Sequence, residues 1–396
     1  MNKKYDITVF GATGFTGELT AIYLASKQKK EDFTLAIAGR DSIKLSAVKL
    51  KIKSQYPEAE IDLITADVMK YSTLLEMASL SKNLITTVGP YLEFGEDVLR
   101  ACVEGKANYF DLTGEGKFVF DMEKIYGRKA KEQEIKIINC CGFDSIPADL
   151  GAYFTVMNLP KEESKVVECF VSFESGDKTL MGGFNSISGG TWHSALGIMS
   201  GNDIDRQKIS FDEIKASNKK RSITPLPMEF RLREETKTYG APLPFVDVEV
   251  VLRSAAELEE YGSSFQYGHF AAIDSTPKLI GGVLGAGLIF GLAQFEPTRD
   301  LLKQFRKQGD GPDAELRSKN SFTLSFIGKS KSKTVTVEVT GGDPGYGDTS
   351  KMLAESAICI LKDDNPEKFG FVTPAISMGQ NLITRLNAAG IKFKVV

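Results

Sequence analysis

The chain has 396 residues, more than a single hydrophobic core usually serves, so two domains are expected. Apolar residues make up 42% and charged residues 26%, and the net charge of −3 comes without a long block of like charges, which gives no reason to expect nucleic acid as a partner. The five cysteines form no CxxC pair and there are only two histidines, so no metal site is expected and a reducing compartment fits.

The first residues, Met-Asn-Lys-Lys, run directly into an apolar stretch and leave no room for a signal peptide. We therefore expect a cytoplasmic protein, with peripheral association to membranes left open.

The first 140 residues alternate short apolar runs with helical stretches, the pattern of a parallel α/β sheet. Strands are predicted at Ile7–Phe10, Thr34–Ala38, Ile61–Thr65, Asn83–Thr87, Ala107–Asp111 and Ile135–Cys140. Helices are predicted at Phe15–Ser26, Ser42–Lys53, Ser72–Ser79, Glu96–Val103 and Val119–Glu132. Residues 1–147 are thus predicted to form a Rossmann-type, doubly wound parallel sheet.

After Pro147 the pattern changes to alternating strands, which predicts an inserted α+β substrate or oligomerisation domain over residues 148–340. Val166–Phe173 reads as a strand, and Phe322–Phe326 pairs with Thr334–Val339 as an antiparallel hairpin. From residue 341 onward a glycine loop, a helix, a second helix and a short strand follow. We expect this C-terminal segment, 341–396, to return to the Rossmann domain.

One segment of the inserted domain, Leu279–Phe295, contains no charged residue and many glycines. It is slightly shorter than the roughly 20 residues that a membrane-spanning helix needs. Three interpretations stay open. The first is a buried helix, an inter-subunit helix that would imply a homodimer, or a loop and helix broken by glycines. The second is a contact with a membrane surface, and the third is a true span.

Directly after the first predicted strand comes a glycine loop, Gly11-Ala12-Thr13-Gly14-Phe15-Thr16-Gly17. In a dinucleotide-binding loop the first glycine permits the tight turn, the second lets the pyrophosphate approach and the third lets the helix pack on the sheet. Amides at the N-terminus of the helix then hold the phosphate oxygens. The residues predicted to bind cofactor here are Gly11, Thr13, Gly14, Phe15, Thr16 and Gly17.

The end of the second predicted strand selects between NAD and NADP. An NAD site places an acidic residue there to bind the ribose hydroxyl, whereas this chain has Ala38-Gly39-Arg40. The guanidinium of Arg40 can pair with a 2′-phosphate, which favours NADP. Asp41 follows directly and keeps NAD open; its alternative role is to cap the next helix.

Two more loops leave the carboxyl ends of predicted strands, where ligands bind in open α/β sheets. Asp67 follows the third strand and is predicted either to contact the adenine or to cap a helix. Val88, Gly89 and Pro90 follow the fourth strand, and the Gly-Pro pair predicts an irregular turn that a cofactor approaches closely.

Taken together, these motifs resemble the saccharopine dehydrogenase-like oxidoreductase family, which includes mycobacterial trans-acting enoyl reductases. The likeness rests on Gly11–Gly17, Ala38–Arg40, Val88–Tyr91, Asp111–Glu115, Gly142–Asp149, Gly189–Trp192 and Gly345–Tyr346. It implies a Rossmann domain closed by the C-terminal segment, NADPH as cofactor and, for the enoyl reductase branch, reduction of a lipid or polyketide intermediate. Some family members associate with membranes or lipid droplets.

A reductase of this kind must orient the nicotinamide and supply a proton. The candidates are Tyr91, Asp144 and Ser145, with Asp149 close by. Helix capping is the alternative explanation for the stretch around Ser145 and Pro147. His193 is a weaker candidate, and Cys140 and Cys141 are expected to be buried packing residues. The loop of Tyr346 is expected either to close over the cofactor or to form a surface connection with an exposed tyrosine.

Three functions remain open at this stage. The first is an NADP-dependent reductase of an enoyl or keto group in an apolar, free or carrier-bound substrate. The second is an NADP-binding sensor or scaffold at membranes without turnover. The third is a saccharopine-type amino-acid dehydrogenase, which needs paired basic residues; Arg231 and Arg233 are the only close arginine pair.

Overall fold

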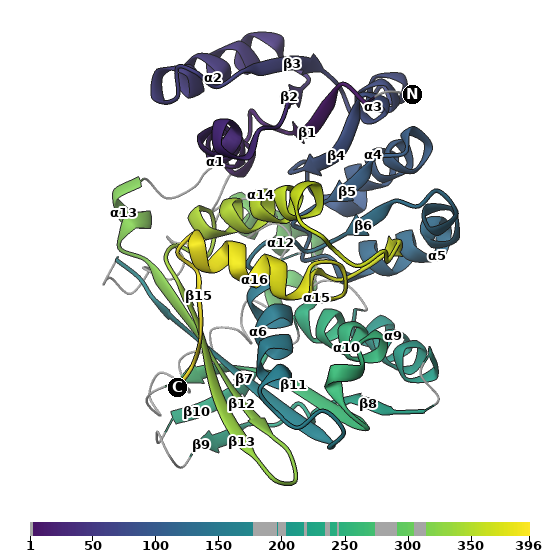
Figure 1. Ribbon diagram of the computed structural model, residues 1–396, viewed down its shortest axis with the longest axis vertical. Helices are drawn as coiled ribbons and strands as arrows, with labels where there is room; N and C mark the ends of the chain where they lie inside the picture. The colour runs from purple at the N-terminus through teal and green to yellow at the C-terminus, as the bar shows by residue number, and fades with distance from the viewer. Residues whose placement is uncertain are drawn as a thin grey trace. The chain divides into compact units, whose positions relative to one another are not determined.

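The computed structural model describes residues 3–176, 196, 203–217, 220–233, 238–243, 245–273, 291–304 and 314–396. The chain forms two compact units (Figure 1). The first unit contains Met1–Ile146 and Gly345–Ala389, and the second contains Pro147–Pro344 and Gly390–Val396.

The first unit contains a seven-stranded parallel sheet in the order β14-β6-β5-β4-β1-β2-β3. Its strands are β1 (Tyr5–Phe10), β2 (Leu35–Gly39), β3 (Ile61–Thr65), β4 (Ser81–Thr86), β5 (Asn108–Phe110), β6 (Lys136–Ile138) and β14 (Gly370–Phe371). The predicted Rossmann-type sheet is therefore confirmed, since the first six strands follow the order 3-2-1-4-5-6 reversed. The strand order reverses between β1 and β4, where such folds bind their ligands.

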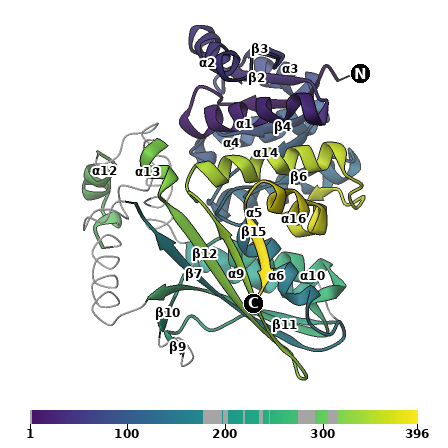
Figure 2. The ribbon, with the colours of Figure 1, turned by 60° about the vertical axis from the view of Figure 1, so that its left-hand side comes forward.

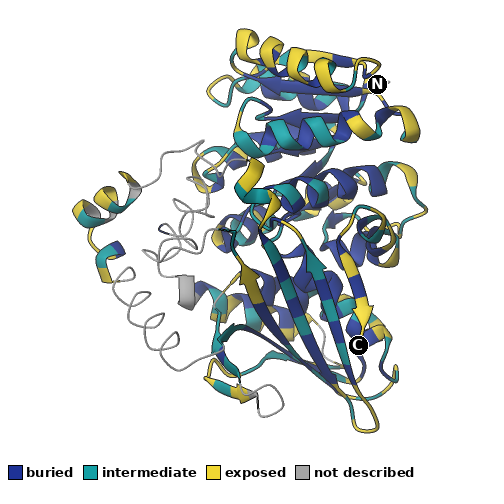
Figure 3. Cartoon of the chain, turned by 90° about the vertical axis from the view of Figure 1, so that its left-hand side faces the viewer, coloured by how far each residue is buried: buried dark blue, intermediate teal, exposed yellow. Residues whose placement is uncertain are grey.

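Helices cover both faces of this sheet. They are α1 (Phe15–Glu31), α2 (Ser42–Gln55), α3 (Tyr71–Leu80), α4 (Tyr91–Gly105), α5 (Gly116–Glu132), α14 (Gly347–Lys362), α15 (Pro374–Ser377) and α16 (Gly379–Ala388). Figure 1 shows α1, α14 and α16 on one face and α3, α4 and α5 on the other. The strands between them are largely buried (dark blue in Figure 3), as apolar strands with two covered faces must be.

Helix α14 returns from the far end of the sequence to lie beside α1. The Tyr23 hydroxyl donates to Glu355 Oε1 at 2.7 Å, and the rings of Phe15 and Tyr346 meet edge to face with centroids 4.8 Å apart. The C-terminal segment lies in the first unit from Gly345 as far as Ala389.

The last residues correct the expectation that this segment returns to the first unit. Strand β15 (Lys392–Val395) pairs antiparallel with β13 (Thr334–Gly341) and so belongs to the second unit. Its alternating pattern explains the placement, because Phe393 is buried while the lysines on either side are exposed. The tail 341–396 is thus shared between the two units.

The second unit contains an eight-stranded mixed sheet, in the order β15-β13-β12-β7-β11-β10-β9 with β8 paired to β11. Its other strands are β7 (Lys165–Glu174), β8 (Ser222–Pro225), β9 (Arg231–Arg233), β10 (Thr238–Pro242), β11 (Ser264–Ile273) and β12 (Ser321–Lys329). The predicted hairpin is confirmed, with Phe326 opposite Val337. Strand β11 runs parallel to β7 and β8, so this sheet is not purely antiparallel.

The helices of the second unit are α6 (Ile146–Met157), α9 (Asp203–Ser217), α10 (Asp247–Glu257), α12 (Glu296–Gln304) and α13 (Ala314–Ser318), with a short 3-10 turn at Glu259–Tyr261. Helices α6 and α10 lie against the sheet (Figure 2). Helix α6 approaches β12 so closely that a Cβ on Gly151 would lie 2.3 Å from the Phe326 ring. This face also carries the buried residues Val167, Cys169 and Leu324, while Phe170, Phe270 and Ile327 form a cluster on the other face.

Two stretches singled out in the sequence lie outside the described residues: Gly189–His193, and positions 279–290 of Leu279–Phe295. In the part of the chain that the structure describes, no helix combines the length and the apolar character needed to cross a bilayer.

Candidate functional site

Two glycines of the loop between β1 and α1 have no room for a side chain. Gly11 has φ +90°, and a Cβ there would lie 2.6 Å from Thr87 Oγ1. A Cβ on Gly17 would lie 2.2 Å from the carbonyl oxygen of Gly11. Any side chain at either position would displace the loop, because such distances fall below van der Waals contact. These glycines therefore fix the course of the turn.

Gly14 differs from both. It is exposed, it is the N-cap residue of α1 with φ −85° and ψ 165°, and a Cβ there would meet only the Gly11 carbonyl oxygen, at 3.3 Å. No side chain caps this helix. The N-terminus of α1 thus presents backbone amides and the positive end of the helix dipole on an accessible surface, which is the arrangement that binds phosphate oxygens.

The next helix, α2, begins with a carboxylate of its own. Asp41 Oδ1 accepts hydrogen bonds from the amides of Ile43 and Lys44, both at 3.0 Å. This is the capping role, so the Asp41 side chain is already engaged, while the preceding residue Arg40 is exposed at the end of β2. A cationic side chain at this edge favours the 2′-phosphate of NADP over the bare ribose of NAD.

The loop after β4 lies beside the glycine loop. Thr87 Oγ1 is 3.3 Å from the carbonyl oxygens of Phe10 and of Gly11, and Val88 Cγ2 lies 2.9 Å from the Cβ position of Gly11. Pro90 is the N-cap residue of α4. The predicted neighbours Val88, Gly89 and Pro90 are therefore at the switch point, and Thr87, which the sequence did not single out, joins the two loops.

Glu115 closes the N-terminus of α4. Its carboxylate accepts from the amide of Tyr91 at 3.0 Å and from the amide of Leu92 at 2.9 Å, and the residue is buried. The sequence placed Glu115 only in a family motif without a role. No local signal could have revealed this cap, because the carboxylate lies far along the chain from the helix that it stabilises.

Asp67, after β3, shapes its own turn. Its Oδ1 accepts from the Met69 amide at 3.0 Å, and its amide donates to Thr73 Oγ1 at 3.0 Å. This is the capping alternative named for Asp67, and a contact with adenine stays a prediction.

Tyr91 has a different place from the one predicted. It is the first residue of α4, and its buried hydroxyl donates to the Thr86 carbonyl at 3.1 Å while its ring packs near Phe118. Burial, with the Asp111 carboxylate nearby, raises the pKa of this hydroxyl well above its usual range. The Tyr91 hydroxyl is therefore engaged inside the unit, and its role as a proton donor stays a prediction.

The loop after β6 carries the other two predicted proton donors. Asp144 is exposed, and a Cβ on Gly114 would lie 3.3 Å from its Oδ1, so the loops that follow β5 and β6 touch. Ser145 is fully buried, and its hydroxyl lies next to the Cys140 thiol. Of the three predicted donors, Asp144 is the one that presents its functional group on the surface. In the second unit, Asp149 is buried and accepts from Ser254 Oγ at 2.6 Å.

Asp111, at the end of β5, holds the loop after β6 against the sheet by hydrogen bonds. Its buried carboxylate accepts from the Cys140 amide at 2.8 Å, the Thr113 amide at 3.1 Å and Asn139 Nδ2 at 2.6 Å. Burial raises the pKa of Asp111 to about 6 despite these hydrogen bonds. Burial also raises the pKa of the Cys140 thiol well above its usual range, and the expectation that Cys140 and Cys141 are buried is confirmed.

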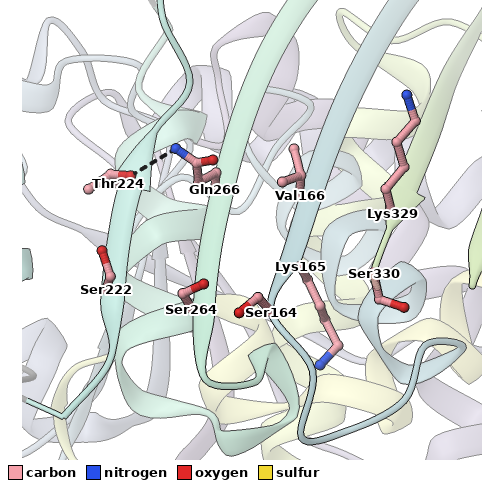
Figure 4. Close-up of a pocket in the computed structure, with 9 residues that line it drawn as sticks. All are labelled: Ser164, Lys165, Val166, Ser222, Thr224, Ser264, Gln266, Lys329 and Ser330. Atoms are coloured by element: carbon pink, nitrogen blue, oxygen red, sulfur yellow. Dashed lines mark hydrogen bonds between the residues drawn. The ribbon is translucent and has the colours of Figure 1, made fainter. Parts of the chain in front are cut away.

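The second unit has a pocket of about 430 Å³ on its sheet, over the ends of β7, β8, β11 and β12 (Figure 4). Hydroxyl-bearing residues dominate its lining: Ser164, Ser222, Thr224, Ser264 and Ser330. Its two lysines are engaged elsewhere, because Lys165 Nζ donates to the Lys161 carbonyl at 2.8 Å and Lys329 Nζ lies 3.8 Å from Glu168 Oε2. The lining is therefore mostly neutral and polar, with Lys329 as its exposed cation.

Comparison with known proteins agrees with the geometry. Residues 7–138 match the saccharopine dehydrogenase NADP-binding domain. The chain is 32% identical to a proposed trans-acting enoyl reductase of Mycobacterium tuberculosis, over 99% of this chain and 97% of that one. It is 31% identical to the saccharopine dehydrogenase-like oxidoreductase of Homo sapiens, over 100% and 98%. The lipid droplet localized protein of Caenorhabditis elegans is 29% identical over 96% and 95%.

Among solved structures, apo saccharopine dehydrogenase (L-Glu forming) from Saccharomyces cerevisiae matches with a TM-score of 0.55, covering 98% of this chain and 99% of that one. At 11% identity this likeness shows the fold alone. The exposed N-terminus of α1, with Arg40 at the end of the next strand, fits the pyrophosphate and the 2′-phosphate of NADP. This chain belongs to the saccharopine dehydrogenase-like oxidoreductase family, and its first unit is an NADP-binding domain.

Proposed function

We propose that the protein is an NADPH-dependent reductase of an enoyl or keto group in an apolar, lipid-like or polyketide-like substrate, free or bound to a carrier. The observation that carries the proposal is the uncapped, glycine-lined N-terminus of α1 beside Arg40, which selects the phosphorylated cofactor. The class of substrate is supported by the names of two relatives, an enoyl reductase and a lipid droplet protein.

The roles in the first unit follow from its loops. Amides at the start of α1 would hold the pyrophosphate, Arg40 the 2′-phosphate, and the Thr87–Pro90 loop would border the cofactor at the switch point. When bound, the cofactor supplies the hydride; the chain has to position it, exclude water and deliver a proton. Asp144, exposed on the loop after β6, is a candidate for contact with the substrate or the nicotinamide.

A saccharopine-type amino-acid dehydrogenase is the alternative reaction, and the described side chains favour it less. Such a substrate carries several carboxylates and calls for cationic partners. Arg231, one of the two closely spaced arginines, already donates to Glu168 Oε1 at 2.7 Å and stacks over the Phe270 ring.

The deciding experiment is a screen of NADPH oxidation, followed by the loss of absorbance of the reduced nicotinamide. Enoyl thioesters, keto thioesters and saccharopine with NADP⁺ are compared under the same conditions. Turnover of an acyl thioester supports the proposal, and saccharopine turnover overturns it. Tight NADPH binding with no turnover of any substrate would instead identify a sensor or scaffold.

We also propose peripheral association with a lipid surface. Support comes from the lipid droplet relative and from three alternating apolar residues near the β9 edge, Met228, Phe230 and Leu232, each more than half exposed. Flotation with phosphatidylcholine vesicles tests the proposal, and Phe290→Asp tests the segment Leu279–Phe295. Retention of the wild-type protein in the pellet with no vesicle-bound fraction would contradict it.

A further inference from the structure

A buried histidine and a buried carboxylate form a pair in the second unit. His269 lies on β11 and Asp247 in the first turn of α10, and His269 Nδ1 is 2.5 Å from Asp247 Oδ2. The side chain of Asp247 is fully buried and that of His269 is 6% exposed. The Tyr267 hydroxyl lies on the same face of β11 and donates to the same carboxylate oxygen at 3.4 Å.

The pair is incomplete on both sides. Among the residues that the structure describes, His269 Nε2 and Asp247 Oδ1 have no hydrogen-bond partner. Buried polar atoms are almost always paired in native proteins, and an unpaired one carries a desolvation penalty that usually has a functional reason. Two such atoms in one pair indicate a place prepared for another molecule.

The charge state of the pair defines what it can bind. Burial works against the charged imidazole, but the adjacent Asp247 carboxylate outweighs burial and raises the pKa of His269 well above its usual range. With both ring nitrogens protonated, Nδ1–H donates to Asp247, and Nε2–H finds no acceptor among the described residues. The complementary group is an oxygen acceptor, such as the carbonyl of a thioester or ketone.

An aromatic ring beside His269 reaches the surface of the unit. Phe245, whose ring meets His269 edge-on at 6.3 Å, is about half exposed, and Cys169 lies opposite His269 on the neighbouring strand β7. An apolar ring beside a single oriented donor is the usual composition of a small-molecule site.

We propose that His269, held by Asp247, is a substrate-binding residue whose Nε2–H donates to the carbonyl oxygen of the acyl substrate. This inference rests on the proposed function. This hydrogen bond orients the acyl group and polarises its carbonyl.

Nitrogen NMR of the imidazoles tests this in the full-length protein. The chain has only two histidines, so a His193→Gln background leaves the signals of His269 alone. Octanoyl-CoA, a saturated thioester that cannot be reduced further at its chain, is the probe. We expect its binding to shift the Nε2 signal of His269 and Asp247→Asn to weaken its affinity about tenfold, with His269→Gln weakening it at least as much.

Ser254→Ala is the matched control, because Ser254 lies on the same helix α10 and donates a buried hydrogen bond to Asp149. It is expected to lower thermal stability as much as the test variants do while leaving octanoyl-CoA affinity unchanged. Octanoyl-CoA binding that leaves the Nε2 signal in place would overturn the assignment of His269 alone. Failure of every acyl thioester to bind wild-type protein would remove the proposed substrate class, and this assignment with it.

Discussion

Helices α1 and α4 begin at the carboxyl ends of neighbouring strands in the same sheet, yet their N-termini are built in opposite ways. Helix α1 starts at an exposed glycine and has no side-chain cap, whereas the first two amides of α4 are bound by the buried carboxylate of Glu115. Both helices offer the same positive dipole end. The N-terminus of α1 is left for an external anion, whereas that of α4 is neutralised by a carboxylate of the protein.

The difference shows that a helix N-terminus can bind phosphate when no side chain of the protein caps its amides. Gly11 and Gly17 determine the turn, because a Cβ at either position would collide with the loop or with Thr87. At Gly14 the constraint is much weaker, because a Cβ would lie 3.3 Å from the Gly11 carbonyl oxygen and the φ of −85° is open to other residues. Its glycine therefore reflects the space that a ligand requires.

The largest effect is expected from Gly14→Asp, which gives α1 the kind of carboxylate that α4 already has. An aspartate is a good N-cap, so thermal stability should be unchanged or slightly higher. The carboxylate would occupy the amides and repel the pyrophosphate. We expect NADPH affinity, measured by calorimetry, to fall about 100-fold, roughly 2.7 kcal/mol of binding free energy.

Gly14→Asn is the control for this variant, since it has the same size and capping ability without the charge. It should weaken NADPH binding clearly less than Gly14→Asp does. Equal NADPH affinity in Gly14→Asp and the wild type would show that phosphate does not bind at this helix.

The second effect concerns the opposite N-terminus. Glu115→Gln removes the charge from the α4 cap and leaves one of two buried amides with a poorly matched partner. We expect the free energy of unfolding in urea to fall by about 2 kcal/mol, while NADPH affinity changes less than threefold. A variant as stable as the wild type but unable to bind NADPH would reverse the roles assigned to the two helices.

A third, smaller effect separates the two cofactors. Arg40→Ala removes the cation at the end of β2 and leaves the Asp41 cap of α2 in place. NADPH affinity should fall about tenfold, about 1.4 kcal/mol, with NADH affinity unchanged. Arg40→Lys keeps the charge but loses the planar guanidinium, so its NADPH affinity should lie between those of the wild type and of Arg40→Ala. A parallel loss for both cofactors would contradict a role at the 2′-phosphate.

The comparison extends to a third helix, α10, whose first turn contains the buried carboxylate of Asp247. This carboxylate pairs with the imidazole of His269. Asp247 raises the pKa of His269, so the stability of this pair is fully present below about pH 6.5, the ordinary histidine value, and is lost as pH rises through the folded-state pKa. The groups facing His269 are Asp247, Tyr267 and Cys169.

The measurement is the unfolding free energy of the wild type and of Asp247→Asn across this pH range. The wild type should be the more stable at pH 6, and its advantage should shrink by about 1 kcal/mol by pH 9.5. An advantage that grows with pH would show that His269 is neutral in the folded protein.

The sequence was sufficient for the parallel sheet and the glycine loop, because apolar runs and glycine spacing are local signals. It did not place the start of α4, which begins at Tyr91 instead of near Glu96, so Tyr91 lies on a helix and not in the predicted loop. The reason is Glu115, whose capping bonds to Tyr91 and Leu92 reach across the fold.

Other parts of the site depend equally on distant contacts. Asp111 accepts a hydrogen bond from an amide in the loop after β6, and β15, at the end of the C-terminal segment, pairs with β13. Neither pairing follows from neighbouring residues. The Asp247–His269 pair likewise joins a helix to a strand more than 20 positions along the chain, and no spacing rule predicts it.

Hydrogen–deuterium exchange of the full-length protein, with and without cofactor, tests the central claim most directly because it locates the ligand. The account predicts that NADPH slows exchange in the peptide spanning Gly11–Gly17 and in the one containing Arg40, whereas NADH protects the first peptide more than the second. Protection by NADPH elsewhere in the chain, with Gly11–Gly17 exchanging as in the free protein, would contradict it.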